Sequence, residues 1–198
     1  MDETLIHHYT PESKQQSKPW TEAGCSAPKK TRSVPSAGKV MASVFWDAEG
    51  ILFIAYLEKG KTITGEYYSN LLTRLDEKIH EKRPGLQEKK IIFHQDNDPA
   101  HKSVLAMGKL RDLHYVLLEH PPYSPDLAPS DFVYLFPKLK LFLTGQRFSL
   151  NQEAIVAVEG YFADLTKNHY RDRIMALQHC WNKCISLKGD NVENKNKL

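Results

Sequence analysis

Three stretches near the start of the chain carry the apolar patterns of β-strands. Residues 3–9 are compatible with a short strand, and two apolar runs follow at residues 39–46 and 51–57. The four residues between these two runs are Asp-Ala-Glu-Gly. A short polar gap that ends in glycine favours a hairpin, because glycine readily takes a positive φ. We therefore predict an antiparallel meander at this end of the chain.

The rest of the chain alternates between helical and strand patterns. Apolar residues recur at helical spacing in residues 65–83, and Pro84-Gly85 ends that pattern. Residues 91–93 form a short continuous apolar run, which is typical of a strand buried on both faces. The remaining predictions are a helix at 103–113, a strand at 115–118, a helix from about 131 and two further helices before a polar tail at 188–198. This order predicts one mixed α/β domain over residues 1–187.

Composition limits the classes of protein that fit this pattern. A chain of 198 residues has room for one ordinary domain, and 41% hydrophobic with 26% charged residues supports a globular core. No apolar run reaches the roughly 20 residues of a membrane span, and the first residues lack the apolar length of a signal peptide. The three cysteines are few and odd in number, which favours a reducing compartment.

Positive charge is concentrated in one long segment, residues 10–39. This segment holds six basic and two acidic residues, four prolines and no periodicity, whereas the whole chain has a net charge of +3. Long loops in compact domains are often functional, and a local positive excess suits a polyanion such as DNA. A loop of solvated charges is the plainer alternative. Lys29, Lys30 and Arg32 also form a candidate nuclear-import patch.

Two aspartates stand where a carboxylate can be held rigidly beside a cleft. Asp96 follows the strand predicted at 91–93, and Asp131 begins a predicted helix directly after Ser130. Ionised carboxylates bind Mg²⁺ together with waters and substrate phosphates. Two such ions about 3.5–4 Å apart can promote phosphodiester cleavage. A turn or a helix cap is the plainer interpretation of either aspartate alone, because 24 acidic residues give many chance sets.

The residues around these aspartates resemble the mariner family of transposases. The two strongest motifs are HQDNDPAH at 94–101 and YSPDLAPSDF at 123–132. Thirty-four residues separate Asp96 from Asp131, and this interval names the family's carboxylate triad. Weaker matches at 2–9, 44–50 and 181–184 extend the resemblance over essentially the whole chain. A full mariner transposase also carries two upstream helix-turn-helix modules, which these residues do not include, so the likeness is to the catalytic domain.

The resemblance implies a ribonuclease H-like α/β fold, with a central mixed sheet flanked by helices. It implies metal-dependent cleavage and strand transfer at transposon ends, with double-stranded DNA as the partner and TA as the target. Two Mg²⁺ or Mn²⁺ ions would lie on Asp2, Asp96 and Asp131, while Asn97 and His101 would orient the metal ligands or the DNA.

The resemblance further implies a homodimer that assembles on two DNA ends in the nucleus. Residues 10–39, with Lys29, Lys30 and Arg32, would then be a clamp that reaches the second subunit or the DNA. A segment that orders only on assembly would fit this composition.

Two other aspartates compete for places in the triad. Asp47 lies between two apolar runs and is interpreted as a hairpin-turn residue, at a position where the family keeps no acid. Asp126 lies in a proline-rich turn, and the 34-residue interval selects Asp131 instead.

Two departures from the family leave a second function open. Leu5 stands where tryptophan is usual, and Asp98 stands where a small residue is typical. The extra carboxylate, two residues from Asp96, can repel phosphates or disturb metal binding. The alternative to an active transposase is therefore a remnant that binds DNA or dimerises without cutting.

Overall fold

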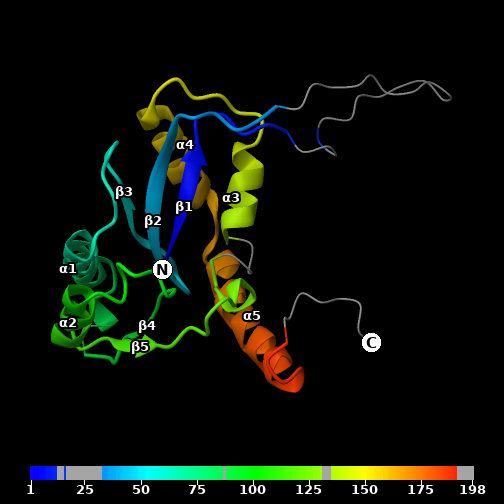
Figure 1. Ribbon diagram of the computed structural model, residues 1–198. Coiled ribbons are helices and arrows are strands. Elements are labelled where there is room, and N and C mark those ends of the chain that lie inside the picture. The colour runs from blue at the N-terminus through cyan, green and yellow to red at the C-terminus, as the bar shows by residue number, and fades with distance from the viewer. Residues whose placement is uncertain (13–15, 17–32, 87, 131–134, 191–198) are drawn as a thin grey trace.

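A computed structural model describes residues 1–12, 16, 33–86, 88–130 and 135–190 of this chain (Figure 1). The strands of the described ranges are β1 (Asp2–His7), β2 (Lys39–Asp47), β3 (Gly50–Tyr56), β4 (Ile92–His94) and β5 (Val116–Leu118). The α-helices there are α1 (Gly65–Lys82), α2 (Val104–Asp112), α3 (Leu135–Leu143), α4 (Asn151–Asp164) and α5 (Lys167–Ser186). Two short 3₁₀ helices are η1 (Pro84–Leu86) and η2 (Pro125–Leu127).

The first three strands form the predicted antiparallel meander. Strand β2 lies between β1 and β3, and Asp2 stands opposite Val44 in the β1–β2 ladder. The β2–β3 hairpin closes at Asp47 and Gly50, and Gly50 adopts a φ of 139° that favours glycine. The hairpin predicted from the Asp-Ala-Glu-Gly gap is confirmed.

Strands β4 and β5 pair in parallel, as expected for strands joined through a helix. One hydrogen bond brings this pair beside the meander, because the Met1 nitrogen donates to the His94 carbonyl at 2.8 Å. The end of β4 therefore lies next to the beginning of β1. Antiparallel and parallel strands, covered by helices, confirm the predicted mixed α/β fold.

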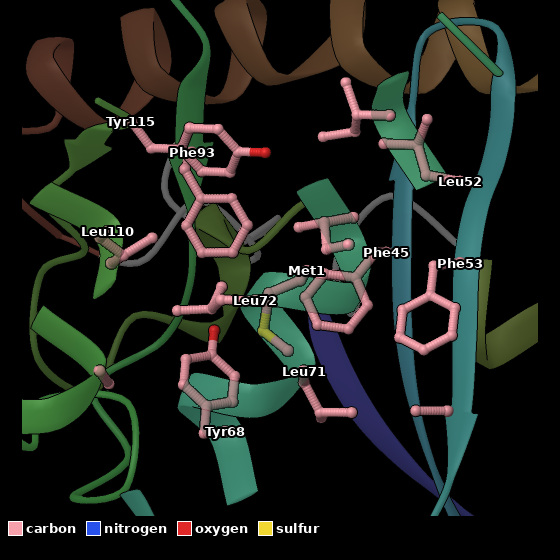
Figure 2. Close-up of a cluster of buried hydrophobic side chains, with 14 residues drawn as sticks. Met1, Phe45, Leu52, Phe53, Tyr68, Leu71, Leu72, Phe93, Leu110 and Tyr115 are labelled. Atoms are coloured by element: carbon pink, nitrogen blue, oxygen red, sulfur yellow. The ribbon is translucent and has the colours of Figure 1, made fainter. Parts of the chain in front are cut away.

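Helices cover the strands in two layers (Figure 1). Helices α1 and α2 pack on one face, where Phe45, Tyr68, Leu72 and Phe93 belong to one buried cluster. Figure 2 shows the Met1 side chain in that cluster, near Phe45 and Leu71. Helices α3, α4 and α5 cover the other face, with a second buried cluster. Neighbouring side chains of β2 alternate between these clusters, so β2 is buried on both faces.

The beginnings of α1 and α2 approach each other closely. The Ser103 hydroxyl caps α2 by accepting from the Ala106 N–H at 3.2 Å. A Cβ added to Gly65, the first residue of α1, would lie 2.2 Å from Ser103 Oγ. This close approach fixes the loop between β4 and α2 against α1.

The two ends of the predicted clamp, residues 10–39, lie side by side. The His8 N–H donates to the Gly38 carbonyl, and the Ser36 N–H donates to the Tyr9 carbonyl, both at 2.9 Å. The Arg147 guanidinium lies over the Tyr9 ring, 4.5 Å from its centroid. Most of the segment, including Lys29, Lys30 and Arg32, lies outside the described residues.

The predicted helices match the structure, apart from one boundary. The first described residue of α3 is Leu135, so the predicted start near Asp131 lies outside the described residues. Of the predicted polar tail, only residues 188–190 are described. In the described ranges, no helix has the length and apolar character that a membrane crossing requires.

Candidate active site

Asp96 stands directly beyond β4, at the start of a tightly turned loop. Its Oδ1 atom accepts a hydrogen bond from the Asp98 N–H at 3.0 Å. Asp98 in turn accepts from the Ala100 N–H at 2.8 Å. Short polar side chains that bind backbone groups two residues ahead are typical turn formers. The turn therefore fixes the backbone on which the Asp96 carboxylate stands, and it gives the exposed Asp98 a local structural task.

The loop returns to Asp96 through His101, whose side chain is 1% exposed. Its Nδ1 atom lies 2.6 Å from Asp96 Oδ1, and its Nε2 atom lies 3.2 Å from Glu3 Oε1. The Tyr68 ring packs on the imidazole, with 4.1 Å between the ring centroids. One buried ring thus joins the loop after β4 to strand β1.

Charge explains why this buried ring is stable. Burial lowers the pKa of His101, but the hydrogen bonds to Asp96 and Glu3 outweigh burial and raise the pKa to about 9. The same hydrogen bond from His101, helped by the Asp98 N–H, holds the pKa of Asp96 below its usual range. At neutral pH the ring is protonated and donates from both nitrogens, so Asp96 Oδ1 accepts two hydrogen bonds.

Asp2 lies close to the same place because β1 begins beside the end of β4. Burial lowers the pKa of the Met1 amino group, while the charges of Asp2, Glu3 and Asp96 oppose that change. The charges of three carboxylates therefore act on one nitrogen, which donates a hydrogen bond to the His94 carbonyl. Asp2 and Glu3 are neighbours in a strand, so their side chains leave opposite faces of the sheet.

Asn97 connects the Asp96 loop to the segment after β5. Its Nδ2 atom donates to the His120 carbonyl at 2.8 Å. The ring nitrogens His94 Nε2 and His120 Nδ1 lie 3.2 Å apart. Burial lowers the pKa of both histidines, to about 4 for His94, so both rings are neutral at pH 7. A cleft of about 490 Å³ opens here, and its lining includes Asp96, Asn97, Lys102, His120 and Pro122.

The third predicted carboxylate, Asp131, lies outside the described residues, but its neighbour Ser130 is described. Ser130 is fully buried, and its Oγ atom accepts from Trp46 Nε1 at 3.1 Å. Val44 and Trp46 both belong to the second buried cluster, so Trp46 lies on the face of the sheet where Asp2 stands opposite Val44. The segment that leads to Asp131 is therefore anchored near Asp2. Within the described ranges, no three His, Cys, Asp or Glu side chains form a metal-binding group.

The two rival aspartates have different environments. Both oxygens of Asp47 bind Arg83, with Oδ2 2.9 Å from Nε, and Oδ1 also accepts from the Glu49 and Gly50 N–H groups. This confirms the interpretation of Asp47 as a turn residue. Asp126 lies buried within η2.

Three residues of this site were missed by the sequence interpretation. The sequence pattern assigns no role to Glu3 and Trp46, which belong to strands, and it places His120 in a turn. The signal for Glu3 was its place beside Asp2, but strand periodicity alone puts the two side chains on opposite faces. Glu3 is part of the site only because the His101 ring contacts both Asp96 and Glu3.

Comparison with known proteins identifies the family and the fold of this chain. Residues 10–89 match a protein family described as Transposase (partial DDE domain), a span that contains none of Asp2, Asp96 and Asp131. A structure of the Mos1 transposase catalytic domain and raltegravir with Mg aligns with a TM-score of 0.74 and 32% identity. That alignment covers 77% of this chain and 76% of the Mos1 chain. The chain belongs to the mariner transposase family. The predicted family and its ribonuclease H-like fold are thereby confirmed.

Longer proteins extend the match. Over 97% of its length, the chain is 31% identical to the Mariner Mos1 transposase of Drosophila mauritiana, and it covers 55% of that protein. Over 76% of its length, it is 34% identical to histone-lysine N-methyltransferase SETMAR of Homo sapiens, covering 22% of it. The crystal structure of the Mos1 mariner paired end complex with Mn aligns with a TM-score of 0.87 over 96% of this chain and 54% of that chain. The chain thus spans about half of Mos1 and a smaller part of SETMAR.

Proposed function

We propose that this chain is a transposase catalytic domain that cuts and joins DNA at transposon ends with the help of divalent metal ions. The observation that carries the proposal is the hydrogen bonding of the Asp96 carboxylate. One of its oxygens is fixed by the buried His101, and no hydrogen bond from the described residues reaches the other. Family membership supports the same reaction class.

The donor set near Asp96 fits a hard divalent cation. Asp2 and Asp96 offer carboxylate oxygens, which Mg²⁺ and Mn²⁺ prefer. The lowered pKa keeps Asp96 ionised at any pH near neutrality. In this proposal Asp2 and Asp96 share two ions, and Asp131 completes the coordination of one. Solved Mos1 complexes contain Mn or Mg, which supports this choice of metals. When bound, such ions activate a water and stabilise the charge on the leaving oxygen.

The remaining residues have positioning roles in this proposal. His101 holds Asp96 Oδ1 and leaves Oδ2 for a metal, and Glu3 holds the far nitrogen of His101. Outer partners of this kind fix the orientation of metal ligands. Asn97 ties the Asp96 loop to His120, at the edge of the cleft.

The partners in this proposal are double-stranded DNA at the transposon ends, with TA as the target, and a second copy of the chain. Solved Mos1 structures include a paired-end complex and a strand transfer complex, and this supports a dimer on DNA. Residues 10–39 would form the clamp between subunits, with Lys29, Lys30 and Arg32 facing the DNA or the second subunit. Action on chromosomal DNA requires a nuclear location, which the same basic residues would favour.

The test is nicking of supercoiled plasmid by the purified chain in Mn²⁺, beside the variants Asp131→Ala and Asp126→Ala. The parent and Asp126→Ala are expected to nick, and Asp131→Ala is expected to be inactive. Thermal unfolding of all three proteins controls for loss of structure. Equal nicking by the parent and Asp131→Ala would overturn the assignment of Asp131.

The same assay separates the enzyme from a non-cutting remnant. Absence of nicking by a folded parent, together with salt-sensitive retention of the plasmid, would favour the remnant, because phosphate contacts weaken as salt rises. Absence of both nicking and retention would overturn both functions.

A further inference from the structure

Strand β3 lies at an open edge of the sheet. In the part of the chain that the structure describes, β3 pairs with β2 alone, and Figure 1 shows no strand on its other side. The Leu57 N–H, directly after β3, donates to the Met41 carbonyl at 2.9 Å. Residues of an antiparallel strand bind the neighbouring strand at every second position. The N–H and C=O groups of Ile54 and Tyr56 therefore point away from β2.

A groove of about 460 Å³ follows this edge. Lys78 and Lys82 of α1 belong to one wall of the groove, and Phe162 and Ala163 of α4 belong to the other. Between the walls lies the continuous run of residues 49–54, which includes most of β3. The groove therefore offers the edge of a strand between two walls of different chemistry, one basic and one largely apolar.

Part of the edge is already covered. The Lys82 ammonium donates to the Leu52 carbonyl at 2.8 Å and to the Ile51 carbonyl at 3.3 Å. The register between β2 and β3 shifts at the same level of the sheet. Lysines and bulges commonly protect edge strands from unwanted pairing. Both features lie in the first half of β3, so its second half stays open.

We propose that this groove binds an extended peptide of another protein, which adds a strand to β3 and turns acidic side chains toward α1. Added strands gain affinity from backbone hydrogen bonds and specificity from alternate side chains. One set of side chains faces α1, where Lys82 has no carboxylate partner among the described residues. The other set faces Phe162 and Ala163 beside Glu159, a wall that accepts apolar side chains and repels acidic ones.

A second copy of this chain fits the edge less well. Antiparallel pairing of β3 with its own copy would extend the sheet across a two-fold axis and keep both α1 helices on one face. Lys78 and Lys82 would then face the same lysines of the other copy, and like charges at close range repel. An acidic peptide is attracted to the same wall. Charge complementarity therefore favours a peptide of another protein.

The test measures binding of the purified chain to a fluorescein-labelled peptide of eight alternating aspartate and valine residues, by fluorescence anisotropy. The parent is expected to bind this peptide, and to bind the matched lysine–valine peptide about 10-fold more weakly. Lys82→Glu is expected to reverse this order of affinities, because it reverses the charge beside the strand edge. Lys59→Glu, at an exposed lysine outside the groove, is the matched control and is expected to keep the parent's order.

Backbone pairing has a separate test. Two versions of the aspartate–valine peptide carry N-methyl groups either on the aspartates or on the valines, which blocks opposite edges of the peptide strand. One version is expected to bind like the unmodified peptide, and the other is expected not to bind. Ile54→Pro removes an outward N–H at an edge position, where proline is tolerated. It is expected to weaken binding while circular dichroism shows a folded chain.

Several results would overturn the proposal. These are absence of peptide binding by the folded parent, equal affinities for the aspartate and lysine peptides, and equal binding of the two methylated peptides. Self-association of the parent that Ile54→Pro abolishes would assign the edge to a second copy instead. The proposed function is tested independently, because β2 and β1 separate β3 from β4 and the Asp96 loop. Plasmid nicking by Lys82→Glu is therefore expected to equal that of the parent.

Discussion

Two aspartates that follow strands use their carboxylates in opposite ways. Asp47, at the end of β2, has both oxygens bound by Arg83 or by the N–H groups of its own turn. Asp96, beyond β4, has Oδ1 bound by His101 and Asp98, and Oδ2 has no hydrogen bond from the described residues. A carboxylate whose oxygens are both satisfied stabilises the fold. One that is fixed through a single oxygen keeps the other for a ligand.

The contrast between Asp47 and Asp96 also shows why an aspartate at the end of a strand is a weak signal of function. Both aspartates are partly buried and both have a basic partner. The difference is that Arg83 offers two donors to one carboxylate, a geometry that suits structural pairing. The His101 ring donates in two opposite directions, to Asp96 and to Glu3. It therefore holds two elements together and leaves one carboxylate edge open.

The largest effect is expected when alanine replaces Asp96 in one variant and Asp47 in another. Asp96→Ala is expected to lower plasmid nicking by on the order of 10³-fold, because a lost metal ligand removes several kcal/mol of transition-state stabilisation. Asp47→Ala is expected to leave nicking within about twofold and to lower the free energy of unfolding by about 1–3 kcal/mol. Initial nicking rates and urea unfolding measure the two effects. Equal losses of nicking in the two variants would show that both carboxylates serve the reaction.

Removing the partner of Asp96 is expected to have the next largest effect. His101→Gln keeps a polar side chain but cannot donate to Asp96 and Glu3 together as a charged ring. Nicking is expected to fall by about 10- to 100-fold, with a higher Mn²⁺ concentration needed for half-maximal rate. Arg83→Gln, at the partner of Asp47, is the matched control and should not move the Mn²⁺ requirement. If His101→Gln needs no more Mn²⁺ than the parent, His101 does not position the ligand.

The charge on His101 also predicts how stability depends on pH. Its pKa in the folded chain is about 9, above the unfolded value of about 6.5. Its contribution is therefore complete below pH 6.5 and is lost as the pH rises through 9. The loss is on the order of 3 kcal/mol, measured as the difference in unfolding free energy between the parent and His101→Gln at pH 6.5 and pH 9.5. Comparing the parent with His101→Gln removes the contributions of other groups that titrate in this range. If the difference in unfolding free energy between the two proteins is the same at both pH values, the prediction is wrong.

The smallest effect is expected at Trp46, directly before Asp47. Trp46→Phe removes the hydrogen bond to Ser130 Oγ and should lower the free energy of unfolding by about 1 kcal/mol. If that bond also positions Asp131, nicking should fall further than in Asp47→Ala. Ser130→Ala removes the same hydrogen bond from the other side and should reproduce both changes. Parent-like nicking in both variants would limit this contact to the stability of the fold.

Local patterns in the sequence determined most of the fold. The hairpin between β2 and β3 follows from two apolar runs around a gap that ends in Gly50, and helix α1 follows from its helical spacing before Pro84. These features depend on residues close in the chain, where turn geometry and periodicity act directly. The sequence also predicted the family, because two long motifs surround Asp96 and Asp131. The predicted triad, metal ions and clamp stay predictions.

The tertiary structure decided how the carboxylates are held, because that depends on residues far apart in the chain. Glu3 and His101 are separated by 98 positions, and Trp46 and Ser130 by 84. Such pairs are set by the order of strands in the sheet and by the layer in which each helix packs, and no local spacing encodes them.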